Sequence, residues 1–106
     1  MLFRSFSMER YERYIARMLA VDGDRCLFIV APDMPFSGDG TIKQFERYGK
    51  RAKETGAPVA FVTQDGMHGE DIPWNDVDAL FVGGGDEWKT NHESGALINE
   101  AHRRGK

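Results

Sequence analysis

The sequence predicts an α/β fold in which parallel strands alternate with crossover helices. Three short apolar runs bounded by turn residues are expected to form strands at about residues 26–32, 58–64 and 79–84. The last begins with the apolar run at residues 79–82, which is bounded by glycine and is expected to be a buried parallel strand. The first two are separated by a segment with helical periodicity, and strands connected in this way pair in parallel through right-handed crossovers. The carboxyl ends of the three strands should therefore meet at one rim of a single sheet.

Helices are expected at about residues 8–20, 41–55 and 92–104. The second should stop at Gly56, and Gly105 should end the third, because glycine adopts the left-handed conformation that closes many helices. The apolar residues of the first helix recur at helical spacing and form its inner face: Met8, Tyr11, Ile15, Met18 and Leu19.

The interval from Met67 to Asp78 is too short for a crossover helix with its loops. A single helical turn at residues 73–76 is expected there instead, with Trp74 as an apolar plug. The candidate N-caps of the first and last helices are, respectively, Ser5 or Ser7 and Asn91 or Ser94.

The length of 106 residues allows one domain at most. Three parallel strands leave both sheet edges open, and an eight-stranded barrel needs about 250 residues. We therefore interpret residues 1–106 as a single segment of a larger barrel-like domain, incomplete at both ends.

The composition is typical of a soluble globular chain, with 41% apolar and 29% charged residues. No stretch is apolar enough to span a membrane, no signal-peptide core is present, and Cys26 is the only cysteine. A cytoplasmic location is the default expectation for such a chain. The net charge of −3 argues against a basic nucleic-acid-binding module but leaves open a base pocket whose phosphate contacts lie elsewhere.

Polar or glycine residues follow each predicted strand: Asp33, Gln64 and the triplet Gly83, Gly84 and Gly85. Each has a structural alternative. Asp33 could cap its own loop, an interpretation that spacing alone slightly favours, and Gln64 could equally bond to loop backbone. The triplet could be a plain turn, although a turn does not need the acidic and aromatic residues just beyond it, Glu87 and Trp88. Together these residues predict a ligand site at the carboxyl rim.

Metal and cofactor chemistry find little support in the sequence. The three histidines lack ligand-like spacing and one cysteine cannot form a thiolate zinc site. The glycine triplet matches neither a phosphate-binding loop nor a dinucleotide fingerprint, and the serines lack a nucleophile elbow. We expect no metal and no cofactor.

Several segments resemble a family of small phage and actinobacterial proteins related to tRNA-guanine transglycosylase, also called queuine tRNA-ribosyltransferase. They are residues 28–33, 58–66, 72–84, 87–89 and 100–106, and the similarity covers nearly the whole chain. The resemblance implies a (β/α)₈ TIM barrel. It also implies a pentosyltransferase that exchanges guanine in nucleic acid for a 7-deazaguanine through a covalent sugar–enzyme intermediate, on DNA in the phage relatives.

The resemblance assigns base binding to Asp33, Gln64, and Gly83 with Gly84. A carboxylate suits N1–H and the 2-amino group of guanine, and amide donors suit its O6. The family's nucleophilic aspartate would follow Lys106. The Asp-containing strand that precedes the family's first helix is replaced by residues 3–7, and the zinc segment of the tRNA enzymes is absent. This chain alone is therefore expected to be inactive, and to meet nucleic acid only through a longer protein.

Two other hypotheses stand beside this one. The chain could be an unrelated α/β module that binds a nucleotide or small ligand through the glycine triplet alone. It could also be an inactive remnant that associates through its open sheet edges. The sequence favours neither DNA nor tRNA as substrate.

Overall fold

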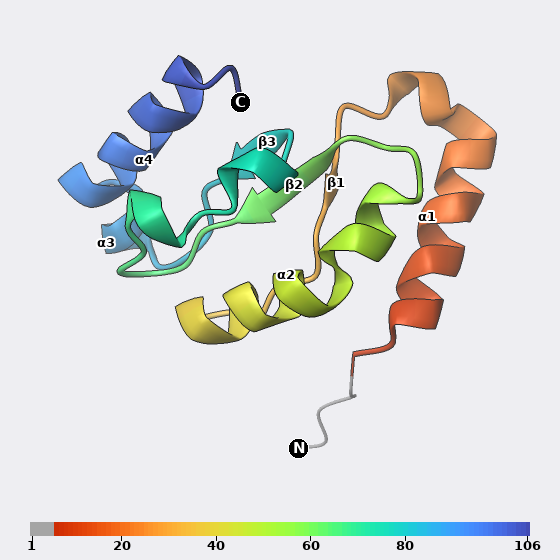
Figure 1. Ribbon diagram of the computed structural model, residues 1–106, viewed down its shortest axis with the longest axis horizontal. Coiled ribbons are helices and arrows are strands. Elements are labelled where there is room, and N and C mark those ends of the chain that lie inside the picture. Colours follow the sequence, from red (N-terminus) through yellow and green to blue (C-terminus); the bar gives the residue numbers. More distant parts are fainter. Residues whose placement is uncertain (1–5) are drawn as a thin grey trace.

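The computed structural model describes residues 6–106 (Figure 1). In chain order the longer elements are α1 (Met8–Asp22), β1 (Ile29–Val30), α2 (Gly38–Lys53), β2 (Val59–Val62), β3 (Ala79–Phe81) and α4 (His92–Arg103). Single turns join them: 3₁₀ turns at Gly23–Arg25, Gly69–Asp71 and Trp74–Asp76, and the short helix α3 (Asp86–Lys89). Within the described residues, no helix combines the length and apolarity needed to cross a bilayer.

The three strands form one open parallel sheet in the order β1-β2-β3, which confirms the predicted α/β class and strand direction. Ile29 lies opposite Val59, and Ala60 lies opposite Ala79. β2 is therefore the central strand, and β1 and β3 are the two edges. The sheet shows no barrel closure in residues 6–106.

The edge strands are shorter and more exposed than predicted. β1 pairs over two residues only. In the register that sets Ile29 opposite Val59, Leu27 lies beyond the start of β2 and has no strand residue opposite it, and its side chain is 83% exposed. The run at residues 79–82 was expected to be a buried strand, and this is wrong for β3: Ala79 and Leu80 are half-buried and Phe81 is 45% exposed. Burial on both faces is confined to the central strand β2, because an edge strand lacks one neighbour.

The two faces of the sheet differ. Ile29, Val59 and Phe61 share one face and join the main core with side chains from the helices, which lie around the sheet in Figure 1. The opposite face carries Phe28 and Phe81, whose rings meet edge to face at 6.4 Å and stay partly exposed. Helices thus cover one face more fully than the other.

Helix starts follow the predicted capping chemistry. Ser7 Oγ accepts a hydrogen bond from Arg10 N–H, and Asn91 Oδ1 accepts one from Ser94 N–H, which decides between the candidate caps among the described residues. Ser5 lies outside them. Helix α2 begins three residues earlier than predicted because Ser37 caps it, accepting from the amide three residues ahead at 2.9 Å.

The end of α4 confirms the role predicted for Gly105. Its φ is +72°, and its amide bonds to the carbonyl of His102. The amide of Lys106 reaches the carbonyl of Ala101 at 2.8 Å. This pair of bonds is a Schellman motif, which satisfies helix carbonyls that would otherwise lack donors.

The connection between β2 and β3 contains the predicted helical turn at Trp74–Asp76, and Trp74 is a buried plug. The indole Nε1–H donates to the carbonyl of Gly69 at 2.8 Å, within a second 3₁₀ turn that the sequence did not indicate. The guanidinium of Arg104 lies 4.9 Å from the centre of the Trp74 ring. This contact joins the end of α4 to the segment that enters β3.

The β1 edge is capped by a side chain from α1. The Tyr11 hydroxyl donates to the carbonyl of Val30 at 2.8 Å, and burial raises the pKa of this phenol from 10.0 to about 12. Covering an edge carbonyl in this way protects a strand from further pairing.

We expect the free energy of unfolding to fall as pH rises from about 10 to about 12, because the folded chain holds the Tyr11 proton more tightly than the unfolded chain does. This contribution is fully present below pH 10. Urea denaturation across this range should show a loss that Tyr11→Phe reduces. Tyr14→Phe is the matched control, since Tyr14 is 64% exposed on the same helix; equal profiles for the two variants would contradict the assignment.

Candidate functional site at the carboxyl rim

The structure brings Asp33 and Gln64 into direct contact at the carboxyl end of the sheet. Gln64 Nε2 donates to Asp33 Oδ2 at 3.1 Å. Gly83 lies beside them, since a Cβ placed on it would be 3.9 Å from Gln64 Nε2. The predicted convergence of these three positions is confirmed; that they bind a base stays a prediction.

The side-chain amide of Gln64 already has hydrogen-bond partners within the chain. Its side chain is 2% exposed, and Oε1 accepts a hydrogen bond from the backbone amide of Phe36 at 3.0 Å. Bonding to loop backbone, the alternative that the sequence left open for Gln64, is therefore what the structure shows. The second N–H of Gln64 and Oδ1 of Asp33 have no hydrogen-bond partner among residues 6–106.

The loop that covers Gln64 is held in an unusual conformation. Phe36 has a φ of +65°, yet its side chain is 84% exposed. A left-handed backbone at a bulky residue costs about 1–2 kcal/mol. The loop is anchored by Thr41, whose Oγ1 accepts from the amide of Met34 and donates to its carbonyl, each at 3.0 Å. Because Gln64 is 2% exposed beneath this loop, a ligand reaches its side chain only if the loop moves.

The glycine triplet is held by the side chains of Thr63 and Asp65, which were not among the predicted site residues. Thr63 Oγ1 accepts from Gly83 N–H and donates to the carbonyl of the same residue, both at 3.2 Å. Asp65 Oδ1 accepts from Gly85 N–H at 2.7 Å. Gly84 N–H has no hydrogen-bond partner among residues 6–106. The position of Asp65, directly after Gln64 at a strand end, is the signal that could have identified it.

Packing also requires glycine at two of these positions. A Cβ on Gly83 would approach Val62 Cγ1 to 2.6 Å. Gly84 has a φ of +111°, and a Cβ there would collide with Asp65 Oδ1 and with Trp88 Cδ1. The triplet thus packs between the end of β2 and the indole ring of Trp88.

Trp88 and Glu87 were predicted to contact a ligand, and the structure separates them. Trp88 is 4% exposed and belongs to the main core, so its ring supports the glycine triplet from behind. Its Nε1–H is buried and lacks a hydrogen-bond partner within the described part of the chain. Glu87 is exposed on the single turn of α3. Of the two, only Glu87 is open to solvent at this rim.

The rim therefore carries hydrogen-bonding groups of complementary type. Asp33 supplies a carboxylate acceptor, Gln64 an amide donor, and Gly84 a backbone donor. Such a set suits a flat polar molecule that has donors on one edge and an acceptor on another. Within residues 6–106 no three metal-ligating side chains come together to hold an ion.

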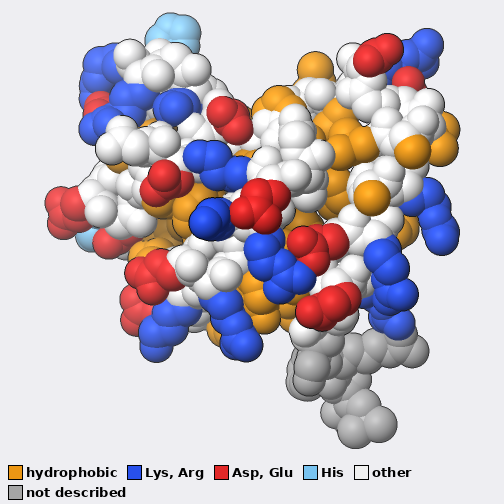
Figure 2. Space-filling view, turned by 45° about the vertical axis from the view of Figure 1, so that its right-hand side comes forward, with side chains coloured by type: hydrophobic (Ala, Val, Ile, Leu, Met, Phe, Trp, Pro, Cys, Tyr) orange, Lys and Arg blue, Asp and Glu red, His pale blue; other side chains and the backbone are white. Residues whose placement is uncertain are grey.

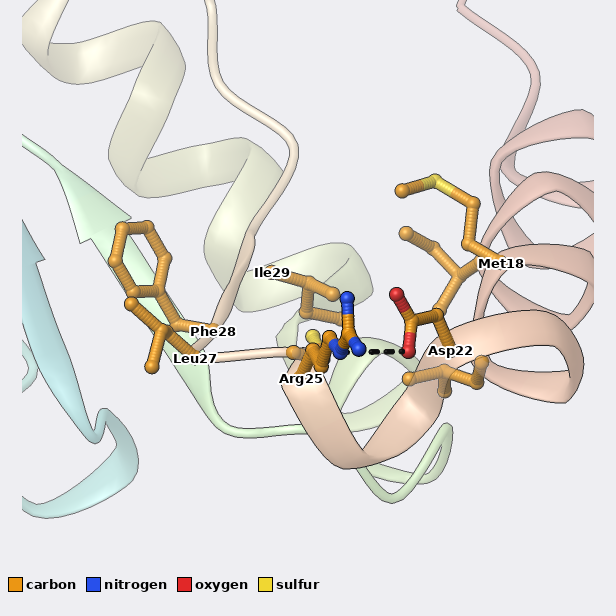
Figure 3. A pocket seen from close by; sticks show the side chains of 9 residues that line it. Met18, Asp22, Arg25, Leu27, Phe28 and Ile29 are labelled. Carbon is orange, nitrogen blue, oxygen red and sulfur yellow. Dashed lines mark ion pairs between the residues drawn. The ribbon is translucent and has the colours of Figure 1, made fainter.

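A hollow of about 350 Å³ lies at the opposite end of the sheet, between α1 and the start of β1 (Figure 3). Met18 and Leu27 line it, together with Arg25 and Asp22, which form an ion pair of 3.5 Å. Figure 2 shows hydrophobic side chains at the surface on the side where α1 lies. Met18 was predicted to face the core but is 56% exposed at this hollow. None of the candidate rim residues lines it.

Comparison of the chain with protein-family models, with curated proteins and with solved structures finds no match in any of the three.

Proposed function

We propose that this chain is the base-recognition part of a transglycosylase-like enzyme that exchanges guanine for a 7-deazaguanine in DNA or tRNA. The contact between Asp33 and Gln64, with Gly83 next to it, is the observation that supports it. In this proposal the three strands are a segment of a (β/α)₈ barrel whose other strands lie on further chain.

The hydrogen-bonding groups match a guanine edge in type. A carboxylate accepts from N1–H and the 2-amino group, and the amide of Gly84 donates to O6. Asp33 is half-buried, so its bonds to such donors would be charge-assisted and stronger than neutral ones. Gln64 is 2% exposed and bonded to the amide of Phe36, so we expect the loop at residues 33–37 to move when a base contacts the Gln64 side chain.

Catalysis needs more than this set of groups. Base exchange requires a carboxylate nucleophile at the sugar carbon, and contacts to the base edge position the substrate without forming a covalent intermediate. Asp65 is bonded to the amide of Gly85, and Asp33 is bonded to Gln64. We therefore expect weak base binding and no turnover from residues 1–106.

The test is a titration with 7-deazaguanine, followed by the backbone amide shifts of the chain in NMR spectra. The proposal expects shifts that converge on Asp33, Gln64, Gly84 and Phe36. Asp33→Asn should weaken binding about tenfold or more, because a hydrogen bond to a charged group contributes about 1.5–3 kcal/mol. Asp24→Asn is the matched control, on an exposed turn before β1.

Two other outcomes would reject the proposal. Shifts confined to residues near Gly85, and caused equally by nucleotides, would indicate a ligand-binding module that uses the glycine triplet alone. The absence of any shift would indicate a chain that binds no base. This chain alone could also incorporate labelled deazaguanine into guanine-containing DNA or tRNA. If Asp33→Ala abolished that incorporation, the catalytic residues would lie within this chain and not beyond Lys106.

A further inference from the structure

Three arginines share the outer side of α1. Arg10, Arg13 and Arg17 recur at intervals of three and four residues, which places them on one side of the helix, and each is exposed. None of them forms an ion pair with a carboxylate of residues 6–106. Figure 2 shows Lys and Arg side chains on the flank where α1 lies. This side of the helix therefore carries three guanidinium groups that can pair with an anionic partner.

The acidic residues of α1 lie away from this side. Glu9 and Glu12 both pair with Arg51 of α2, Glu9 at 3.8 Å. Asp22 ends the helix, more than one turn beyond the last of the three arginines, and Asp24 follows it in the next turn. No other acidic residue occurs in α1. The arginine side of the helix is therefore positive along its length.

The row of arginines begins at the carboxyl rim. The Tyr11 hydroxyl bonds to the carbonyl of Val30 at the end of β1, whereas Met18 and Leu19 line the hollow at the opposite end of the sheet. Helix α1 therefore starts beside the rim and runs away from it (Figure 1). Arg10, in the first turn, is the arginine nearest the rim.

The rim itself is unsuited to phosphate groups. Asp33, Asp65, Asp86 and Glu87 lie there, and Lys89 is already paired with Asp86 at 3.6 Å. A nucleic-acid strand whose base enters the rim must therefore place its phosphates on a neighbouring surface that carries cations. The arginine side of α1 is such a surface.

An exposed aromatic ring lies among the arginines. Tyr14 is 64% exposed, and it lies four residues after Arg10 and three before Arg17, so the three side chains are neighbours on the helix surface. Proteins hold single strands by pairing cations with phosphates and by stacking bases on aromatic rings. A membrane fits this helix less well, because lipid that covered Met18 would also bury the carboxylate of Asp22, which lines the same hollow.

We propose that this side of α1 binds the sugar–phosphate backbone of a single-stranded nucleic acid, with Tyr14 stacked on one of its bases. The inference rests on the proposed function, because it places the strand whose guanine enters the rim. An arginine binds phosphate oxygens through two N–H groups at once. Such contacts were expected only on further chain, and the three arginines place them within residues 6–106.

The test is the fluorescence anisotropy of a labelled oligothymidine, measured at several salt concentrations. Three phosphate contacts on a single strand predict that the logarithm of the binding constant falls with the logarithm of salt concentration at a slope of about −2. Arg17→Gln should weaken binding at least about threefold at low salt and reduce the slope by about 0.7. Arg103→Gln, the same change on α4 beside the opposite edge of the sheet, is the matched control and should alter neither.

Two substitutions of Tyr14 test the stacking contact. Tyr14→Ala should weaken binding at least about fivefold, whereas Tyr14→Phe should retain it because the ring is kept. Circular dichroism checks that each variant folds. An oligothymidine that does not bind at low salt, or equal effects of the two arginine substitutions in folded variants, would overturn the proposal. Binding to phosphatidylglycerol vesicles in place of oligothymidine would also overturn it and would indicate a membrane surface.

This test is separate from the titration with 7-deazaguanine, because oligothymidine contains no guanine. Failure to bind oligothymidine, together with shifts that converge on Asp33 and Gln64, would reject only the α1 surface. Binding of oligothymidine without any shift caused by 7-deazaguanine would support the α1 surface and reject the base pocket.

Discussion

Replacing Phe61 with alanine is expected to lower the free energy of unfolding by about 3–5 kcal/mol. Phe61 is 1% exposed in the central strand and belongs to the main core. Its ring packs edge to face against Phe45 of α2, with centroids 5.5 Å apart. Truncation removes the apolar contacts and leaves a cavity between β2 and α2 that the surrounding backbone cannot fill.

Urea denaturation followed by circular dichroism measures this change, and an unaltered m value would show that two-state unfolding is retained. Phe36→Ala is the matched control, because it deletes the same atoms from a side chain that is 84% exposed. That variant should stay within about 0.5 kcal/mol of the original chain. Similar losses for both variants would mean that Phe61 does not occupy the core as described.

Replacing Gly84 with alanine is expected to cost about 2–4 kcal/mol. The φ of +111° is unfavourable for any residue with a Cβ, and the added methyl would collide with Asp65 and Trp88. The triplet must shift to relieve the clash, which should break the bond from Gly85 N–H to Asp65. Denaturation gives the cost, and the amide shift of Gly85 reports the broken bond.

Gly95→Ala is the control for this substitution. Gly95 lies in α4, and a Cβ there meets no atom within 4 Å. Alanine is the better helix former by up to about 1 kcal/mol, so this variant should be as stable as the original chain or more so. A Gly84→Ala variant that matched it in stability would show that the triplet is a flexible turn without packing constraints.

The function remains a prediction, whereas the fold was predictable in outline. Apolar runs, glycine stops and capping residues are local signals, and they predicted the parallel sheet, the three long helices and the buried turn at Trp74. The strand ends also predicted which residues would share a rim, because parallel strands place their carboxyl ends together. That inference needed no side-chain contacts, and the Asp33–Gln64 bond agrees with it.

Amino-acid sequence alone thus determined the order and direction of the elements, since these depend on periodicity and on short connections. Only the tertiary structure decided which groups at the rim are free. Gln64 bonds to Phe36, 28 positions away, and Asp65 bonds to Gly85, 20 positions away. It also placed Trp88 in the core and left Phe81 partly exposed. Side-chain pairing and burial depend on contacts between distant segments, and these arise only when the segments pack together.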